Sequence, residues 1–378
     1  MYRGGSFHDP PRRARTMARN PFLSFPRSQQ VRITVNNQVL RGIMSAVCAA
    51  ALATTPVVVD AYAAADPGAR LVSRTQTGQT VDISVYSPSM DRTIALRVLR
   101  PADTTTPAPT LYLLNGAGGG EDSANWPGQT DAAGFFADKH VNVVIPMEGA
   151  FSYYTDWREP DAGLAKNLEN NGHNMWTTFL TRELPPVIDA AFATTGDNAL
   201  AGISMAGTSV LDLAIQAPQL YRSVAAYSGC AMTSDPIGRA FVSLVVRLGG
   251  GDVENMWGPV TDAAWREHDP YVQAHRLPDI PIYISSGSGL PGAHDTLANP
   301  RVHINGKNPQ SILTNQMLVG GGIEAASAYC TASMGRRAQE LGRTNITVNV
   351  RPTGTHSWGY WEDDLHVSWP MLATSLGL

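Results

Sequence analysis

The chain has 378 residues, with 28 Lys or Arg and 32 Asp or Glu, which gives a formal net charge of −4 at pH 7. Residues 1–63 hold eight arginines and two acidic residues, so the rest of the chain has 20 basic and 30 acidic residues, a net charge of −10. Nucleic acid is therefore not an expected partner, because polyanion binding needs a positive surface.

The first part of the chain has the order of charge and hydrophobicity that is typical of a secretory signal. Its arginines end at Arg41, an apolar run extends from Gly42 to Val59, and small residues follow. A membrane anchor is the alternative, but Pro56 interrupts the run, which lacks the roughly 20 apolar residues that a span needs. We expect residues 1–65 to be a targeting region, with translation starting at Met1 or Met17. The protein is then secreted or held in the cell envelope, without a stable membrane span.

Residues 66–378 are numerous enough for one large domain, and no second break in composition divides them. The runs expected as strands are 80–86, 93–99, 107–114, 141–147, 198–203, 223–228, 280–285 and 346–350, and the expected helices are 175–193 and 206–216. The first two strands form an antiparallel pair. The alternation after them predicts an α/β fold, a mostly parallel sheet with helices on both faces. The interval 231–279 lacks this pattern, and we expect an irregular lid or wall.

Ser204 lies between an apolar strand and an apolar-periodic helix. Its small neighbours are Gly202, Ala206 and Gly207. A serine on a sharp strand-to-helix turn is strained and exposes its hydroxyl at the edge of the sheet, and only small neighbours let the two backbones pass. The turn also aims the N–H of Met205 at the same point, where a helix N-terminus favours an oxyanion. An ordinary capping serine would not explain the small neighbours, so we expect Ser204 to be the nucleophile of an α/β-hydrolase fold.

A second N–H donor should come from a loop that follows an earlier strand. The loop from Asn115 to Gly120 follows the strand expected at 107–114 and has glycines at four of its six positions. Glycines let a backbone approach a reacting carbonyl closely. A plain flexible turn is the alternative.

A base and an orienting acid must follow the nucleophile in the chain order Ser, acid, His. His356 comes after the strand expected at 346–350, and we favour it over His366, whose context is helical. Between Ser204 and His356, Glu324 opens a long helix, whereas Asp262 and Asp295 stand in polar loops that look solvated. A glutamate in a first helical turn is also a common capping residue, so position alone leaves the acid open.

Two cysteines remain when Cys48, in the expected signal, is set aside. Cys230 follows the strand expected at 223–228, and Cys330 lies six residues beyond Glu324. An even pair in an oxidising compartment is a disulfide candidate, and a bridge here would brace the helix that carries Glu324. Two buried free thiols are the alternative.

Several motifs resemble, in the same order, the antigen 85 mycolyltransferases of mycolic-acid-bearing actinobacteria, an α/β-hydrolase family. They are Leu111–Gly116, Phe151–Trp157, Trp176–Pro185, Gly202–Gly207, Met256–Pro259 and Gly354–Trp358. The resemblance runs from about residue 70 to the C-terminus. It implies transfer of a mycoloyl chain from one trehalose monomycolate to another, or to cell-wall arabinogalactan, through an acyl-enzyme. It implies no metal and no organic cofactor.

Position by position, the resemblance implies Ser204 as nucleophile, His356 as base, and the N–H groups of Met205 and Ala117 as the oxyanion hole. It also implies Glu324 as the acid, because the family's catalytic Glu precedes its His by the same 32 residues as here.

The resemblance also implies a sugar side of the site, formed by Asn115, Gly116, Ser357 and Trp358. Asn115 stands where mycobacterial members have Asp, and Gly118 where they have Arg. Both positions lie near the trehalose site, so the acceptor can differ. A secreted carboxylesterase would share every catalytic residue. A non-catalytic envelope-binding protein on the same fold would be expected to lack the serine or the histidine, and both are present here.

Overall fold

The computed structural model describes residues 68–304 and 306–378. The targeting region expected at 1–65, together with Cys48, lies outside these residues.

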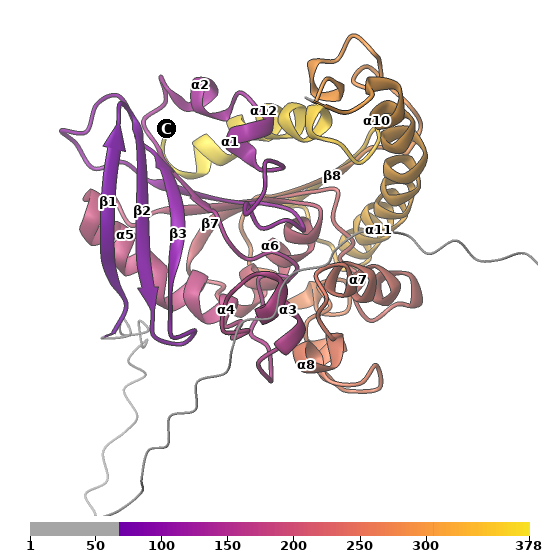
Figure 1. The fold of residues 1–378 in the computed structure, drawn as a ribbon, viewed down its shortest axis with the longest axis horizontal. Helices are drawn as coiled ribbons and strands as arrows, with labels where there is room; N and C mark the ends of the chain where they lie inside the picture. The colour runs from indigo at the N-terminus through magenta and orange to yellow at the C-terminus, as the bar shows by residue number, and fades with distance from the viewer. Residues whose placement is uncertain (1–67, 305) are drawn as a thin grey trace, which may run out of the picture. The chain divides into compact units, whose positions relative to one another are not determined.

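One mixed sheet organises the described residues (Figure 1). Its order is β1-β2-β3-β5-β4-β6-β7-β8-β9. The strands are β1 (Arg70–Thr77), β2 (Thr80–Ser87), β3 (Arg92–Leu99), β4 (Thr110–Leu114), β5 (Asn142–Pro146), β6 (Asn198–Ile203), β7 (Tyr221–Tyr227), β8 (Ile282–Ser286) and β9 (Ile346–Val350). Strands β1, β2, β3 and β5 pair antiparallel, and all pairs from β5 to β9 are parallel. The eight expected strands are confirmed, with ends shifted by three residues or fewer.

Helical segments cover both faces of the sheet. They are α1 (Trp126–Gln129), α2 (Ala132–Phe136), α3 (Ala162–Asn167), α4 (Trp176–Thr178), η1 (Phe179–Glu183), α5 (Leu184–Phe192), α6 (Met205–Gln216), α7 (Pro236–Leu248), α8 (Val253–Trp257), α9 (Ala264–Glu267), η2 (Ala274–Arg276), η3 (Pro300–Val302), α10 (Pro309–Asn315), η4 (Gln316–Gly320), α11 (Gly321–Glu340) and α12 (Trp358–Ser375). In Figure 1, α1, α2 and α12 lie above the sheet, and α6 and α7 lie below it.

Each central strand contributes to two hydrophobic cores. Leu111 and Leu113 of β4 pack in the core beneath α1, α2 and α12, whereas Tyr112 and Leu114 pack in the core that α5, α6 and α11 cover. Side chains alternate between the two faces of a strand, and here both faces are covered. All residues of β4, β5, β6 and β8 are therefore buried.

Three segments differ from the sequence expectation. Strand β1 was not expected, because it is an edge strand exposed along its whole length and has no apolar face. The helix expected at 175–193 is divided by the π-helical turn η1, and it restarts at α5, where Pro185 and Pro186 have no N–H to donate.

The third correction concerns the interval 231–279, which is not irregular throughout but holds α7, α8, α9 and η2, joined by turns and irregular segments. Its longest helix, α7, buries Gly238, Val242 and Val246 but leaves Leu244 and Leu248 exposed. The buried residues recur every four positions, so the helical period is present in the sequence. The interval 231–279 contacts α6 through His268, whose Nδ1 lies 2.8 Å from Oδ2 of Asp212 in α6.

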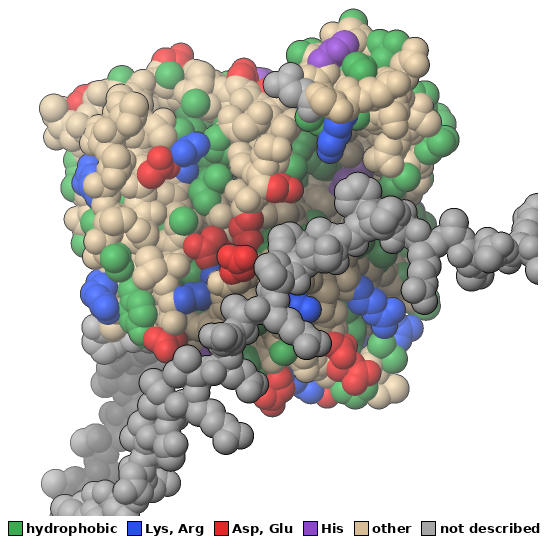
Figure 2. All heavy atoms as spheres, in the orientation of Figure 1, with side chains coloured by type: hydrophobic (Ala, Val, Ile, Leu, Met, Phe, Trp, Pro, Cys, Tyr) green, Lys and Arg blue, Asp and Glu red, His purple; other side chains and the backbone are tan. Residues whose placement is uncertain are grey.

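Charged side chains of both signs are interspersed on the face of the molecule seen in Figure 2. Of the helices that the structure describes, none is both long and apolar enough to cross a membrane.

Candidate active site

Ser204 occupies the sharp turn between β6 and α6. Its φ of 54° and ψ of −118° fall in a region that non-glycine residues rarely adopt. A Cβ on Gly202 would lie 2.9 Å from the Ala206 Cβ, and one on Gly207 would lie 2.5 Å from the carbonyl oxygen of Tyr227. The prediction that only small neighbours fit around Ser204 is confirmed by these distances.

His356 lies in the loop between β9 and α12 and contacts two of the predicted residues. Its Nε2 is 2.7 Å from Ser204 Oγ, and its Nδ1 is 2.7 Å from Glu324 Oε2. An ionised carboxylate only accepts hydrogen bonds, so Nδ1 carries the proton and Nε2 is free to accept one from the serine. The Trp361 ring packs edge-on against the imidazole, with ring centroids 4.9 Å apart. The backbone N–H of His356 donates to the Gly320 carbonyl at 3.2 Å.

Glu324 lies in the first turn of α11 and is fully buried. While Oε2 faces the histidine, Oε1 accepts hydrogen bonds from Ser228 Oγ at 2.7 Å and from the Gly287 N–H at 2.5 Å. Both carboxylate oxygens thus have partners, as a buried charge requires. Of the three acids weighed from the sequence, Glu324 is the one that contacts His356.

The two rival acids and the rival histidine are engaged elsewhere. Asp262 forms two hydrogen bonds of 2.6 Å with the Arg158 guanidinium. The expectation that Asp295 is solvated is wrong, because its side chain is buried among four donors. His366 stacks on the Phe135 ring with centroids 4.1 Å apart.

The loop from Asn115 to Gly120 passes beside Ser204. A Cβ on Gly116 would lie 3.4 Å from the Ser204 Cβ. Gly119 has a φ of 64°, and a Cβ there would lie 2.1 Å from the backbone nitrogen of Ala150, so the loop needs glycine at this position. No hydrogen bond recorded for residues 68–304 and 306–378 uses the N–H of Ala117 or of Met205. Both groups therefore remain available to a ligand.

Asn115 has a different environment from the one expected of a sugar-contacting residue. Its side chain is fully buried. Its Nδ2 donates to the Pro146 carbonyl at 2.8 Å, and its Oδ1 accepts from the Trp126 N–H at 3.0 Å. The amide holds the loop together and presents no free group to a ligand.

The remaining residues of the expected sugar side lie next to His356. Ser357 and Trp358 are half-buried, and the Trp358 ring packs edge-on against Trp126 and Trp361 at 5.6 and 5.1 Å. At position 118, a Cβ would lie 3.0 Å from Asp122 Oδ1, so the Asp122 carboxylate lies directly against the glycine. Sequence reasoning missed Asp122, whose position depends on the course of the loop.

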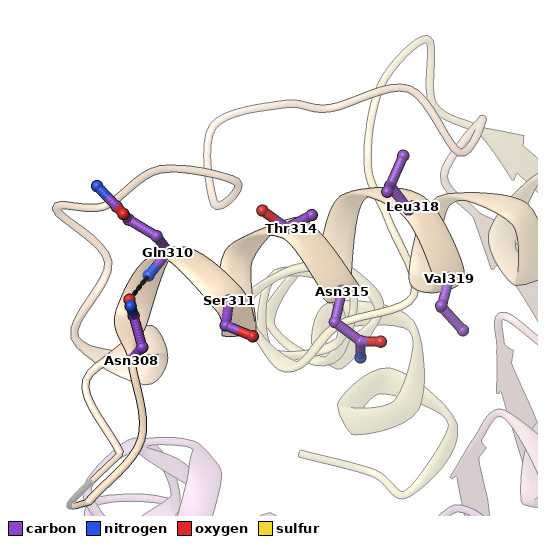
Figure 3. Close-up of a pocket in the computed structure, with 7 residues that line it drawn as sticks. All are labelled: Asn308, Gln310, Ser311, Thr314, Asn315, Leu318 and Val319. Carbon is purple, nitrogen blue, oxygen red and sulfur yellow. Dashed lines mark hydrogen bonds between the residues drawn. The ribbon is translucent and has the colours of Figure 1, made fainter. Parts of the chain in front are cut away.

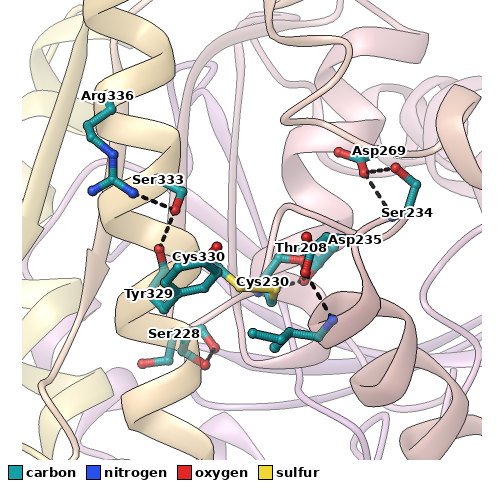
Figure 4. Close-up of a disulfide and its surroundings, with 12 residues drawn as sticks. Thr208, Ser228, Cys230, Ser234, Asp235, Asp269, Tyr329, Cys330, Ser333 and Arg336 are labelled. Carbon is teal, nitrogen blue, oxygen red and sulfur yellow. Dashed lines mark hydrogen bonds between the residues drawn. A yellow bond between two sulfur atoms is a disulfide. The ribbon is translucent and has the colours of Figure 1, made fainter.

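Cys230 and Cys330 are joined by a disulfide with an S–S distance of 2.07 Å (Figure 4). The bridge connects the segment after β7 to α11, the helix of Glu324. Thr208 lies one turn of α6 beyond Ser204, and its Oγ1 accepts from the Cys230 N–H at 3.0 Å. The bridge and this bond link the segments that carry Ser204 and Glu324.

A surface hollow of about 530 Å³ lies along α10 and η4, lined by residues from Asn308 to Val319 (Figure 3). None of the site residues predicted from the sequence lines it. Its lining ends one residue before Gly320, whose carbonyl accepts the His356 N–H. The hollow thus does not contain Ser204, His356 or Glu324.

The family described as "Putative esterase" matches residues 87–371. The diacylglycerol acyltransferase/mycolyltransferase Ag85A of Mycobacterium leprae is 31% identical over 300 residues, 78% of this chain and 83% of that protein. The protein of the same name from Mycobacterium tuberculosis is 30% identical over 78% of this chain and 81% of its own length.

Two solved structures share the fold. Mycobacterium tuberculosis MPT51 (FbpC1) matches with a TM-score of 0.62 and 24% identity, over 81% of this chain and 99% of that one. FphF, a fluorophosphonate-binding serine hydrolase of Staphylococcus aureus, matches with a TM-score of 0.53 and 16% identity, over 78% and 98%. The α/β-hydrolase fold expected from the sequence is confirmed.

Proposed function

Since the chain belongs to the antigen 85 family of esterase-like proteins, we propose that it is an exported serine acyltransferase that moves a mycoloyl group through an acyl-enzyme on Ser204. The donor is a trehalose ester, and the acceptor is a second trehalose ester or cell-wall arabinogalactan. The observation that carries the proposal is the unbroken contact from Ser204 through His356 to Glu324, on a strained strand-to-helix turn.

In the first step, the Ser204 hydroxyl attacks the carbonyl carbon of the ester. His356 Nε2 lies 2.7 Å from Ser204 Oγ, which is within reach for proton transfer. As the C–O bond forms, the serine proton moves to Nε2. Glu324 holds the ring by its Nδ1–H and stabilises the imidazolium that results.

The tetrahedral intermediate carries a negative oxygen, which needs donors. We assign this role to the N–H groups of Met205 and Ala117. The first is at a helix N-terminus, where the partial positive charge favours an anion. Each such donor contributes about 3 kcal/mol in comparable serine enzymes.

When the intermediate collapses, the bond to the sugar oxygen breaks, and His356 returns its proton to the leaving trehalose. A hydroxyl of the acceptor then enters, gives its proton to Nε2 and attacks the acyl-enzyme. When this second intermediate collapses, the bond between the acyl carbon and Ser204 Oγ breaks, and Nε2 returns the proton to Oγ. The products are a new ester and a regenerated Ser204. Transfer in place of hydrolysis requires that water be kept from the acyl-enzyme.

A secreted carboxylesterase is the second candidate. The missing side chain at Gly118 favours it, because this position offers no charged group to a sugar. In that case water takes the place of the acceptor hydroxyl, and the rest of the mechanism is unchanged.

Incubation of the processed protein with trehalose monomycolate, followed by separation of the lipids, tests the proposal. An acyltransferase yields trehalose dimycolate, whereas an esterase yields free mycolic acid at a rate that added trehalose does not change. Absence of both products from the wild type would contradict both candidates and favour a non-catalytic envelope-binding protein. The Ser204→Ala variant is the blank for each reaction.

A further inference from the structure

Asp295 is a buried carboxylate in the connection between β8 and α10, with 8% of its surface exposed. Oδ1 accepts hydrogen bonds from Thr355 Oγ1 at 2.6 Å and from Gln316 Nε2 at 2.7 Å. Oδ2 accepts from the Tyr360 hydroxyl at 2.6 Å and from the Gly292 N–H at 2.8 Å. All four partners are neutral donors, and each oxygen takes two of them.

Three of these partners belong to segments that carry or hold the triad. Thr355 directly precedes His356. Gln316 begins η4, the turn that ends at Gly320, whose carbonyl accepts the His356 N–H at 3.2 Å and which lies four residues before Glu324. Tyr360 is in the first turn of α12, directly after the histidine loop. One carboxylate thus joins the loop of the base to the helical segment of the acid.

Asp295 remains ionised at neutral pH. Burial by itself would raise its pKa, but the hydrogen bonds from Thr355, Tyr360 and Gln316 outweigh burial, and the pKa lies below the ordinary value of an aspartate. A charged acceptor forms shorter and stronger hydrogen bonds than a neutral one, so these contacts hold their donors firmly.

We propose that Asp295 is a positioning residue for the reaction, fixing the His356 loop against the η4–α11 segment so that the imidazole stays between Ser204 and Glu324. The proposal rests on the proposed function, because it assigns Asp295 a role only through that triad. Asp295 itself contacts neither Ser204 nor His356 in the recorded hydrogen bonds of the described residues.

The substitution Asp295→Asn keeps the shape of the side chain but replaces one acceptor oxygen with an NH₂ group. Each oxygen of Asp295 accepts from two donors, so in either orientation of the new amide its NH₂ group faces two groups that also donate. The Thr355 and Tyr360 hydroxyls can rotate to accept, and the Gln316 amide can turn its oxygen inward, but the Gly292 N–H cannot accept. The new amide is therefore expected to face Thr355 and Gln316 with its NH₂ group. This replaces hydrogen bonds to a charged oxygen with weaker ones between neutral groups and so loosens the contact nearest His356.

The test compares Asp295→Asn with Asp161→Asn in the full chain. Asp161 is also a buried acid with a lowered pKa, but its partners are Leu164, Asp252 and Asn255, on α3 and around α8. With a p-nitrophenyl ester, we expect Asp295→Asn to lower kcat by about 10- to 100-fold while KM changes by less than about twofold, since small misplacements have effects of this size. Labelling of Ser204 by a fluorophosphonate should slow by the same factor. Asp161→Asn should leave kcat within about twofold, at a similar loss of thermal stability.

Equal kcat values for the two variants would overturn the positioning role. If Asp295→Asn does not fold, Thr355→Val decides the question, because it removes one contact and keeps the shape. We expect it to lower kcat by about 3- to 10-fold, the equivalent of one ordinary hydrogen bond, and an unchanged kcat would reject the proposal. The Ser204→Ala variant distinguishes a failure of the positioning role from a failure of the proposed function, because turnover that survives in this variant contradicts the proposed function itself.

Discussion

Ser228 Oγ donates a hydrogen bond of 2.7 Å to Glu324 Oε1. Ser228 Oγ also accepts a hydrogen bond of 2.9 Å from Trp361 Nε1, and the Trp361 ring packs against the imidazole of His356. One hydroxyl therefore orients Glu324 and fixes the ring that packs against His356.

Ser228→Ala is expected to remove both contacts at once and to leave the Trp361 N–H without a partner. An unpaired buried donor costs about 1–3 kcal/mol, so the free energy of unfolding should fall by this amount. We also expect kcat to fall more than KM changes. Urea unfolding and ester kinetics measure the two effects, and Trp361→Phe is the control, because it removes the ring N–H but keeps the bond to Glu324.

Ser204→Ala and His356→Ala should each abolish nearly all turnover. The double variant should be hardly worse than either single one, since the residues act as one unit. A serine-reactive phosphonate should label Ser204 alone, which peptide mass spectrometry detects. Additive losses or a label on another residue would speak against the triad.

Gly207→Ala should destabilise the fold, because the added Cβ would lie 2.5 Å from the Tyr227 carbonyl oxygen on the neighbouring strand. Overpacking of this kind costs about 1–3 kcal/mol. Gly134→Ala is the matched control: it lies in α2, and apart from its chain neighbours and the backbone of its own helix, no described atom stands within 4 Å of its added Cβ. Thermal unfolding of the two variants should therefore show a lower Tm only for Gly207→Ala.

Reduction of the Cys230–Cys330 disulfide should lower both Tm and turnover. The two cysteines are 100 positions apart, and the loop-entropy model gives about 4–5 kcal/mol for such a closure. Turnover should fall because α11 loses its link to the segment after β7. A non-reduced digest gives the direct readout: two separately alkylated peptides in place of one cross-linked pair would rule out the bridge.

Asn115→Asp is expected to act on stability and to leave acceptor choice unchanged. The Asn115 amide donates to the Pro146 carbonyl, and a carboxylate at this place would face that oxygen without a proton. The free energy of unfolding of the Asn115→Asp variant should therefore be lower by about 1–3 kcal/mol. The ratio of transfer to hydrolysis with trehalose present should not change, whereas a changed ratio would show that position 115 contacts the sugar after all.

The sequence predicted the central strands and the position of Ser204 well, because both depend on local patterns. An apolar run between turn residues indicates a buried strand, and small residues around a serine indicate a sharp turn. The choice of Glu324 over Asp262 and Asp295 as the acid depends instead on contacts between distant segments. Asp295 stands in a polar stretch and is nevertheless buried, because its four donors come from segments up to 65 positions away. No local pattern records such contacts.

Two elements escaped prediction for different reasons. Strand β1 has no buried face and therefore no alternation to detect. Helix α7 does have a buried face, because Gly238, Val242 and Val246 recur every four residues. Its helical period is therefore present in the sequence, and the turn residues that follow it in the interval 231–279 led to the wrong expectation.

The π-helical turn η4 makes the site sensitive to length. Together with α10 and α11 it forms one run of helix from Pro309 to Glu340. A π-turn holds an extra residue, and each residue turns a helix by about 100°. Leu318 and Val319 are exposed, so either side chain could be exchanged with little effect. Deleting either residue would convert the π-turn into a regular α-turn and leave Glu324 facing His356, whereas one more inserted residue would rotate Glu324 by about 100° away from it, so this stretch tolerates the loss of a residue but not a gain.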